Sequence, residues 1–442
     1  MNTEAYDHTV RQFIQKHDRK CARQPFRWWQ LLWYLTIFCL LCVFVLWRWD
    51  YFLIGINLFI AVFYFSVIFC KLLVVFFSIV RPREIRISEK TLQPMRPESL
   101  PVYTILIPLY NESNVAEKIL RHLKKIDYPK SKLDIKLLLE EDDRATQVAC
   151  RMLNLPSYFE TIIVPDGSPK TKPRACNHGL EKARGEFLVI YDAEDRPDPL
   201  QLKKAAAAFR ELPEDVVCLQ SKLNYYNPEQ NLLTKWFTIE YTVWFDFFLP
   251  GLHSLGAPIP LGGTSNHFKT RELRSLGGWD PFNVTEDCDL GIRLARDRKK
   301  TVVLDSTTWE EANSEIFNWI RQRSRWVKGY IQTHLVHMRN PFRTFLELGP
   351  FGFVFFLLTV GGLSAMLLLN VIYWMVAAVY CGLLARDFAA GHMITRVIAG
   401  PRDYPRHAWQ MLFTGPREDP LWSGISVVFF WITVTLLLSN MV

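Results

Sequence analysis

Uncharged, strongly apolar runs lie near both ends of the chain. Residues 28–47 and 51–70 contain no charged side chain, and the second run continues past Lys71 to Val80. At about 1.5 Å of rise per residue, each run is long enough as a helix to cross about 30 Å of hydrocarbon. The pattern predicts a transmembrane hairpin of two helices over residues 28–80.

The C-terminal part repeats this pattern. Residues 348–385 are uncharged over about twice the length of one span, and residues 421–442 are uncharged again. We expect two transmembrane helices in the first stretch and one in the second, so five is the minimum number of spans. Basic residues beside the runs predict that residues 1–27, 81–347 and 386–420 are cytoplasmic, in a multi-pass protein of the inner or plasma membrane.

The middle region, residues 81–347, has a different pattern. Short apolar or β-branched runs alternate there with polar helical stretches, and the runs are residues 102–107, 135–139, 161–164, 187–191 and 216–219. This alternation is typical of an α/β domain with a mostly parallel sheet. Because ligands of such sheets bind at the carboxyl ends of the strands, the residues just after each run are the candidate site residues.

Composition narrows the class of protein. Half of the residues are hydrophobic and 14% are aromatic, which excludes a disordered chain. The net charge of +8 fits a membrane surface and a phosphate-bearing ligand equally well, and we expect no nucleic-acid partner. The nine cysteines have neither a disulfide-framework nor a zinc-site spacing, so we expect a reducing compartment.

Carboxylates follow three of the predicted strands. Glu112 follows the first, residues 140–143 are four acidic residues after the second, and Asp192 and Glu194 follow the fourth. Carboxylates at positions i and i+2 after a strand can hold a hard divalent cation, Mg²⁺ or Mn²⁺, which would neutralise a diphosphate. Taken alone, the turn at Glu112 also fits a helix cap, and the acidic run also fits a solvated surface.

Further candidates lie on predicted helices. Lys172 and Arg174 introduce a helix and could contact phosphates, although such a basic pair is more often solvated. Asp287 lies at the start of another predicted helix, where an aspartate is usually interpreted as a helix cap. Gln322, Arg325 and Trp326 share a later helix, expected from about residue 316, in which an aromatic ring beside an amide and a guanidinium suits a sugar. An interfacial tryptophan near a membrane is nearly as common.

The order of these motifs resembles the membrane-integrated family 2 glycosyltransferases, which include cellulose and hyaluronan synthases. The motifs, between residues 102 and 326, are Pro-x-Tyr-Asn-Glu, an acidic strand end, Lys-x-Arg-Ala-x-Asn, Asp-x-Glu, Thr-Glu-Asp and Gln-x-x-Arg-Trp. The tracts 140–143 and 192–199 look most like the XagB and β-glucan synthase branch. The chain departs from the pattern twice, because relatives commonly have Asp-Gly at the uridine-contacting position and Asp-x-Asp as the metal motif.

The resemblance implies an α/β GT-A (Rossmann-like) glycosyltransferase domain flanked by transmembrane helices. It also implies roles for ten residues. Glu112, Glu140 and Asp142 would bind the uridine portion, Lys172 the diphosphate, Asp192 with Glu194 the donor's metal ion, Asp287 would be the general base, and Gln322, Arg325 and Trp326 would hold the acceptor end and the diphosphate.

The same resemblance implies an inverting, metal-dependent hexosyltransferase. It would use a UDP-sugar, with UDP-glucose favoured, to elongate a β-linked exopolysaccharide processively and move it across the membrane. Its partners would be the UDP-sugar, the growing glycan, membrane lipids, and secretion or regulatory subunits. Two alternatives stay open, namely a non-processive enzyme that adds one sugar to a membrane lipid and a non-catalytic transporter or assembly subunit.

Overall fold

The computed structural model describes residues 6–18, 20–93, 95–113, 121–371 and 374. Within the whole chain two compact units are distinguished, one comprising Met1–Pro25 and Leu73–Val360, the other Phe26–Leu72 and Gly361–Val442. The predicted spans and the cytoplasmic segment that lie beyond residue 374 are outside the described residues.

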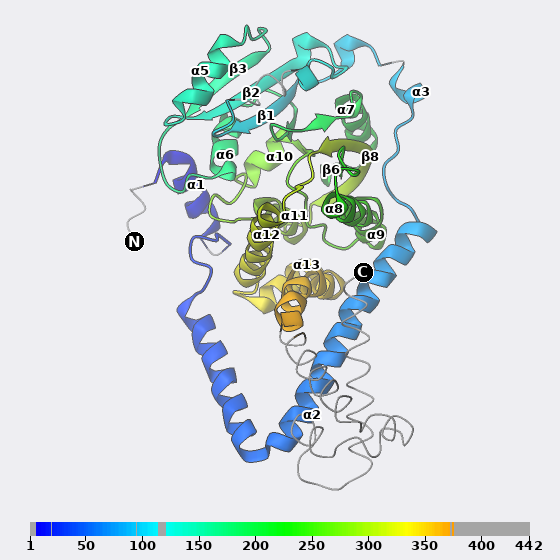
Figure 1. Ribbon diagram of the computed structural model, residues 1–442. Coiled ribbons are helices and arrows are strands. Elements are labelled where there is room, and N and C mark those ends of the chain that lie inside the picture. The colour runs from blue at the N-terminus through cyan, green and yellow to red at the C-terminus, as the bar shows by residue number, and fades with distance from the viewer. Residues whose placement is uncertain (1–5, 19, 94, 114–120, 372–373, 375–442) are drawn as a thin grey trace. The chain divides into compact units, whose positions relative to one another are not determined.

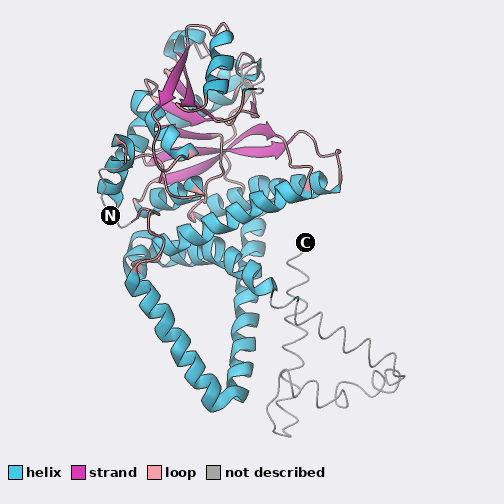
Figure 2. Ribbon diagram, turned by 60° about the vertical axis from the view of Figure 1, so that its left-hand side comes forward, coloured by secondary structure: helices cyan, strands magenta, loops and turns pink. Residues whose placement is uncertain are grey.

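The first unit is organised by one mixed sheet, drawn as magenta arrows in Figure 2. Its eight described strands are ordered β3-β2-β1-β4-β7-β6-β8-β5. In chain order the strands are β1 (Tyr103–Leu109), β2 (Leu133–Glu140), β3 (Phe159–Val164), β4 (Phe187–Ile190), β5 (Arg196–Pro197), β6 (Val216–Tyr225), β7 (Asn266–Lys269) and β8 (Lys300–Glu310).

Strand direction brings several loops to one edge of this sheet. Strands β1 to β4 are mutually parallel, and β6 is parallel to β8. Strand β7 is antiparallel to both β4 and β6, so the sheet is mixed, whereas the sequence pattern predicted a mostly parallel one. The sequence of β7, Asn-His-Phe-Lys, has no apolar run that would have revealed it. The carboxyl ends of β1, β2, β4, β6 and β8 therefore meet the amino end of β7.

Helices cover both faces of the sheet, as Figures 1 and 2 show. The helices of the first unit are α1 (His8–His17), α3 (Glu89–Leu92), α5 (Arg144–Met152), α6 (Lys172–Lys182), α7 (Gln201–Glu211), α8 (Leu232–Thr242), α9 (Leu249–Leu255), α10 (Thr270–Ser275), α11 (Glu286–Arg296), α12 (Ile316–His337) and α13 (Pro341–Phe356), with the short 3-10 turns η2 (Pro97–Ser99) and η3 (Lys130–Lys132) and the π-helical turns η4 (Val243–Phe248) and η5 (Leu357–Gly362).

Alternating side chains of the central strands build the two layers of the core. Ile105 of β1 packs with Leu202 of α7 on one face. Its neighbour Leu106 packs on the other face with Leu180 of α6. This alternation is what a strand with both faces covered requires, and it fixes the strand register because a slip of one residue would exchange the faces.

The apolar helices follow the sequence pattern in part. Helix α2 (Trp28–Val80) is one bent helix, where two separate helices of a hairpin were predicted (Figure 1). Two described helical stretches are long and apolar enough to cross a membrane, Leu58–Val80 and Pro341–Val371, and Trp28–Phe44 is apolar but shorter. Within α13, Gly349 has a φ of 72° before Pro350, which kinks that helix. Membrane topology and the predicted domain limits remain predictions.

A close helix–loop contact offers a test of this packing. A Cβ added at Gly291 of α11 would lie 2.2 Å from the carbonyl oxygen of Ile259, so Gly291→Ala must displace the helix that begins with Glu286 and Asp287. We expect a loss of about 1–3 kcal/mol in the free energy of unfolding. Thermal unfolding of the detergent-solubilised protein measures it, and Gly55→Ala, with no atom within 4 Å of the added carbon, is the matched control. Equal melting temperatures for the two variants would contradict the prediction.

Candidate active site

The predicted site residues gather at the edge of the sheet where the strands β1, β2, β4 and β8 end. Glu112 follows β1, Glu140 ends β2, and Asp192 follows β4. Glu310 ends β8 at the same edge. The parallel registers of these strands explain why residues far apart in the sequence come together there.

The Asp-x-Glu turn is held in place by the residue that follows it. Asp195 is fully buried, and its Oδ2 atom accepts hydrogen bonds from the Asp192 amide, at 2.8 Å, and from the Thr264 hydroxyl. The Ser265 amide donates to the carbonyl oxygen of Ile190 at 2.9 Å. The loop before β7 and the turn after β4 are thus one hydrogen-bonded unit.

Lys172, the first residue of α6, lies at the centre of the charges. Its Nζ atom pairs with Asp192 Oδ1 and donates to the carbonyl oxygen of Gly263 at 3.0 Å. Although burial acts in the opposite direction, Asp192 and Glu286 raise the pKa of Lys172 above its ordinary value. The lysine is therefore a cation near neutral pH.

Asp287 and Glu286 begin α11 beside the same loop. Asp287 Oδ1 accepts from the Cys288 amide at 2.7 Å, and a Cβ on Gly263 would lie 3.5 Å from Asp287 Oδ2. Burial raises the pKa of Asp287 to about 6. Burial, and then repulsion by Asp287, raises the pKa of Glu286 to about 8. Near neutral pH the pair therefore holds one proton, on Glu286.

Glu112 faces the Asp-x-Glu turn from the loop after β1. This loop is fixed by the Asn111 amide, which donates to Asp143 Oδ2 at 2.6 Å. Burial, followed by repulsion from Glu194 and Asp192, raises the pKa of Glu112 to about 7. Burial and Asp192 likewise raise the pKa of Glu194. The buried Oε2 atom of Glu112 has no hydrogen-bond partner among the described residues.

The four acidic residues after β2 have separate contacts. Glu140 is buried and pairs with Arg174 Nη1 at 3.3 Å. Asp142 is exposed and pairs with Lys170 Nζ at 2.7 Å. Asp143 caps α5 by accepting from the Thr146 amide at 3.1 Å. Of the two residues predicted to bind uridine here, Asp142 is thus the more accessible.

The Gln-x-x-Arg-Trp residues lie on the first half of α12. Gln322 Oε1 accepts from the side-chain amide of Asn313 at 2.6 Å, and Arg325 is exposed. The Trp326 ring lies 5.9 Å from the ring of Phe237 and 6.3 Å from that of Tyr241, between ring centroids. The predicted helix start at residue 316 is confirmed, and Trp326 belongs to an aromatic cluster.

Helix α12 approaches the Thr-Glu-Asp motif closely. A Cβ at Gly329 would lie 2.4 Å from Thr285 Cγ2, so the absence of a side chain permits this contact. The electrostatic neighbours of Asp287 include Tyr241 and Tyr330, from α8 and α12. The structure therefore brings the predicted base and the predicted acceptor helix together.

Sequence reasoning missed two residues of this site, Glu310 and Arg323. Burial, and then repulsion from Asp195 and Asp192, holds the pKa of Glu310 well above its ordinary value. Arg323, rather than Arg325, is the guanidinium that lies over the Trp326 ring, 4.9 Å from its centroid, and it pairs with Glu240 of α8. A signal for Glu310 existed, since it ends a β-branched run, but nothing in the sequence distinguished Arg323 from Arg325.

The carboxylates of this site are candidate ligands of a divalent cation. In the part of the chain that the structure describes, no three His, Cys, Asp or Glu side chains are already arranged as ligands. Glu112, Asp192 and Glu194 nevertheless repel one another, and Glu112 has an unpartnered oxygen. These hard oxygen donors fit Mg²⁺ or Mn²⁺ if a diphosphate completes the coordination.

The chain is similar in sequence to known glycosyltransferases. Residues 187–389 match the family described as glycosyl transferase family group 2. The chain is 26% identical over 287 residues to the probable glycosyltransferase YdaM of Bacillus subtilis, covering 62% of this chain and 68% of YdaM. It is 26% identical over 244 residues to the beta-monoglucosyldiacylglycerol synthase of Trichormus variabilis, covering 54% of this chain and only 50% of the synthase.

A solved structure is also similar. It is the mannosyltransferase PcManGT from Pyrobaculum calidifontis in complex with GDP-Man and Mn²⁺, which has 16% identity and a TM-score of 0.45 and is matched over 86% of this chain and 99% of that one. In sequence the chain is therefore similar to family 2 glycosyltransferases, with the family match confined to residues 187–389.

The role of Asp195 in holding the Asp-x-Glu turn is testable. Asp195→Ala removes the acceptor shared by the Asp192 amide and Thr264, whereas Asp195→Asn retains a side-chain oxygen at that place. We expect the Ala variant to lose about 1–3 kcal/mol of stability because a buried donor is left unpaired, and its transferase activity to fall at least tenfold. The Asn variant should keep most of both. Thermal unfolding and initial rates measure this, and equal losses in the two variants would contradict it.

Proposed function

We propose that this protein transfers a hexose from a UDP-sugar, with UDP-glucose favoured, to an acceptor hydroxyl with inversion of configuration. The observation that carries the proposal is the convergence of Lys172, Asp192 and Asp287 around Gly263. A cation that can bind a leaving diphosphate and a carboxylate that can accept a proton are the two groups that direct displacement requires.

The donor would lie along the ends of β1, β2 and β4. Lys172 opens α6, so the diphosphate would meet both its ammonium and the amino end of an 11-residue helix. The exposed Asp142, supported by the buried Glu140, would contact the uridine portion. The positive groups at the start of α6 and the acidic end of β2 are separate, so they form two subsites. Two subsites favour a nucleoside diphosphate over a single phosphate.

A divalent cation would be held by Asp192 and Glu194, with Glu112 as a further oxygen donor. When bound, Mg²⁺ or Mn²⁺ would offset the negative charge of the leaving diphosphate. The mutual repulsion of these carboxylates supports this assignment, because a cation relieves it.

Asp287 would take the proton of the acceptor hydroxyl. Its raised pKa matches a base that works near neutral pH, and Glu286 beside it keeps its own proton. Trp326, with Tyr241 and Gln322 nearby, would hold the acceptor. Attack from the face opposite the diphosphate then inverts the anomeric centre, so that an α-linked donor gives a β-linked product.

The role of Asp287 predicts a pH profile. The base must be ionised, and its pKa of about 6 lies above the ordinary value. We therefore expect kcat/KM to be level above pH 7 and to fall about tenfold for each pH unit below 6. Asp287→Asn should lower turnover by about 10² or more while UDP binding changes little.

The matched control is Glu286→Gln, which replaces the adjacent carboxyl that carries a proton at neutral pH. We expect it to lose less than about tenfold, as it leaves the base in place. Initial rates between pH 5 and 9 and UDP titrations make the comparison. Turnover of Asp287→Asn above about a tenth of the wild-type rate would exclude Asp287 as the base.

The acceptor is proposed to be the end of a β-linked exopolysaccharide that the enzyme elongates processively and moves across the membrane. The aromatic cluster of Trp326, Tyr241 and Phe237 supports a saccharide acceptor, since such rings stack on sugars. The glucomannan 4-beta-mannosyltransferase 7 of Arabidopsis thaliana, 23% identical over 239 residues, agrees with a glycan product.

A membrane lipid is the second candidate acceptor. It is favoured by two beta-monoglucosyldiacylglycerol synthases with 26% and 27% identity, each matched over half of its length. In both cases the catalytic unit would face the cytoplasm, with the apolar helices in the inner or plasma membrane. Membrane lipids, and secretion or regulatory subunits for a polymer, would be its partners.

Product size separates the two acceptors. We expect membranes containing the protein, given radiolabelled UDP-glucose and Mg²⁺ or Mn²⁺, to form a β-linked polymer that stays behind on organic extraction. A chelator should stop its formation, and Asp287→Asn is the blank. A single labelled lipid in the organic phase would replace the polymer proposal with the lipid one, and no transfer from any UDP- or GDP-sugar would reject both.

A further inference from the structure

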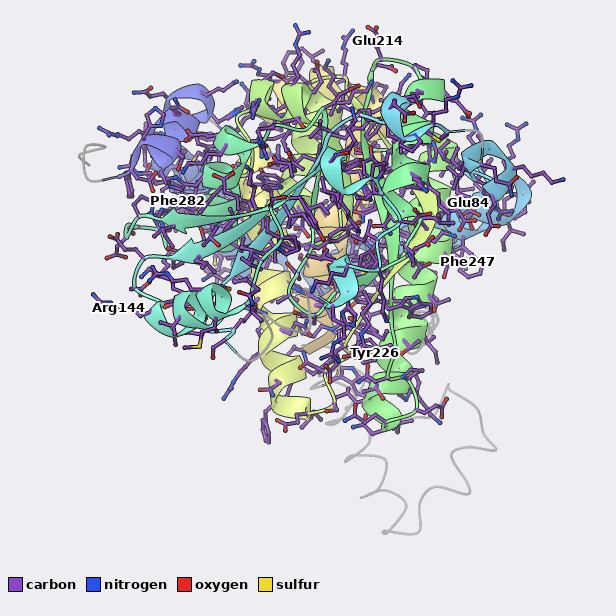
Figure 3. All side chains as sticks on the ribbon, turned by 90° about the horizontal axis from the view of Figure 1, so that it is seen from above. Glu84, Arg144, Glu214, Tyr226, Phe247 and Phe282 are labelled. Atoms are coloured by element: carbon purple, nitrogen blue, oxygen red, sulfur yellow. The ribbon has the colours of Figure 1, made fainter. Side chains whose placement is uncertain are left out.

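The N-terminal segment is packed on the catalytic unit. We call residues 6–18 and 20–24 the strap. Its helix α1 buries Val10, Phe13 and Ile14, and Phe282 packs against this cluster. Figure 3 shows Phe282 on the side of the molecule where the N-terminal helix lies. The strap lies outside the residues that match the glycosyl transferase family, so the family match assigns it no role.

The strap also contacts the segments that lead to the predicted base. The His17 ring bonds to the carbonyl oxygen of Leu276 at 2.6 Å, and the Ala22 amide donates to Asp280 Oδ2 at 2.5 Å. From α12, Gln332 donates to the carbonyl oxygen of Ala22 at 3.3 Å. The strap is thereby fixed to the segment before α11 and to helix α12.

At its other end the strap forms a buried ion triad. Arg174 of α6 is fully buried, and its Nε atom donates to Asp7 Oδ2 at 2.5 Å while Nη1 reaches Glu140 Oε2 at 3.3 Å. Its Nη2 atom donates to the carbonyl oxygen of Pro165, and a Cβ on Gly167 would lie 2.7 Å from that nitrogen. One guanidinium thus joins the strap to the ends of β2 and β3.

Asp7 supplies the second negative charge to this cation. Without it, Arg174 would have one buried carboxylate partner, Glu140, at the longer of the two distances. A buried guanidinium needs compensation at more than one nitrogen, so loss of Asp7 would free Arg174 to shift. The shift would reach Glu140 and the turn after β3, which flank the exposed Asp142 and Lys170.

We infer that Asp7 is a positioning residue for the donor site, acting through Arg174 on the ends of β2 and β3. This inference rests on the proposed use of a UDP-sugar. Asp7 alone of the strap residues is assigned this role, and its effect falls on donor affinity rather than on the chemical step.

The decisive variant is Asp7→Asn, tested in the full chain. Asp7 also caps α1 by accepting from the Val10 amide at 3.0 Å, and asparagine is an equally good cap, so the strap helix is retained while the charge is lost. We expect the dissociation constant of UDP with Mn²⁺, and KM for the UDP-sugar, to rise about tenfold with kcat within twofold. Amide exchange should rise in residues 141–143 and 165–168.

The matched control is Lys20→Gln, which removes the ion pair of the same strap with Asp297, 3.2 Å away at the end of α11. We expect wild-type UDP affinity and wild-type exchange in both segments. Equal impairment of the two variants would show a merely structural strap and overturn the inference. So would an Asp7→Asn variant whose UDP affinity stays within twofold of wild type, or whose exchange is unchanged.

The exchange measurement also separates this inference from the proposed function. If the wild-type protein binds no UDP but Asp7→Asn still raises exchange in residues 141–143 and 165–168, the proposed donor is wrong and the link from Asp7 to these segments is supported. If UDP binds and exchange is unaffected by the variant, the donor stands and the inference fails.

Discussion

The arrangement of this enzyme depends on the pairing of Lys172 with Asp192. Many carboxyl groups converge on one edge of the sheet, and such a gathering is unfavourable unless cations or protons offset it. The lysine offsets part of it, and raised pKa values let Glu112, Glu286 and Glu310 share protons for the remainder. Repulsion between the carboxylates therefore remains in the site when no substrate is bound. A metal-bound diphosphate would add charges of both signs and change the repulsion between these carboxylates.

Backbone contacts hold the carboxylates in place despite their mutual repulsion. The Asp-x-Glu turn is tied by Asp195 to the loop before β7, and Lys172 is tied to the same loop through Gly263. Asp287 lies against that glycine. A loop with little side-chain bulk thus sets the spacing between Lys172, Asp192 and Asp287, for which the roles of cation, metal ligand and base are proposed. Side chains with long flexible arms would not hold these distances without such a frame.

Much of the sheet could be predicted because its buried strands are continuous apolar runs. Strands β1 to β4 lie within a few residues of their predicted limits, and the start of α12 at Ile316 agrees with its prediction. Strand β7 could not be predicted, because a four-residue strand with one apolar side chain carries no periodicity. The acidic candidates could be located from their positions after strands. The partners of these acidic residues could not be predicted. Arg174 and Glu140 are brought together only by the order of β3, β2 and β1 in the sheet.

The aromatic side of the site shows the same limit. Sequence spacing placed Gln322, Arg325 and Trp326 on one helix, but it could not show which arginine faces the rings. The answer depends on where α8 packs, because Glu240 of that helix draws Arg323 over Trp326. Local periodicity gives the face of a helix, whereas the neighbour that covers this face is a property of the tertiary fold.

The reversed direction of β7 has a further effect on how this protein can vary. Because β7 is hydrogen-bonded to β4 on one side and to β6 on the other, the loop that enters the site ahead of it is anchored within the sheet rather than at its margin. An extra residue in that loop would shift β7 against two strands at once and turn its buried side chains to the opposite face. Lineages of such enzymes should therefore tolerate changes of length in the outer loops and keep the number of residues between 261 and 266 constant.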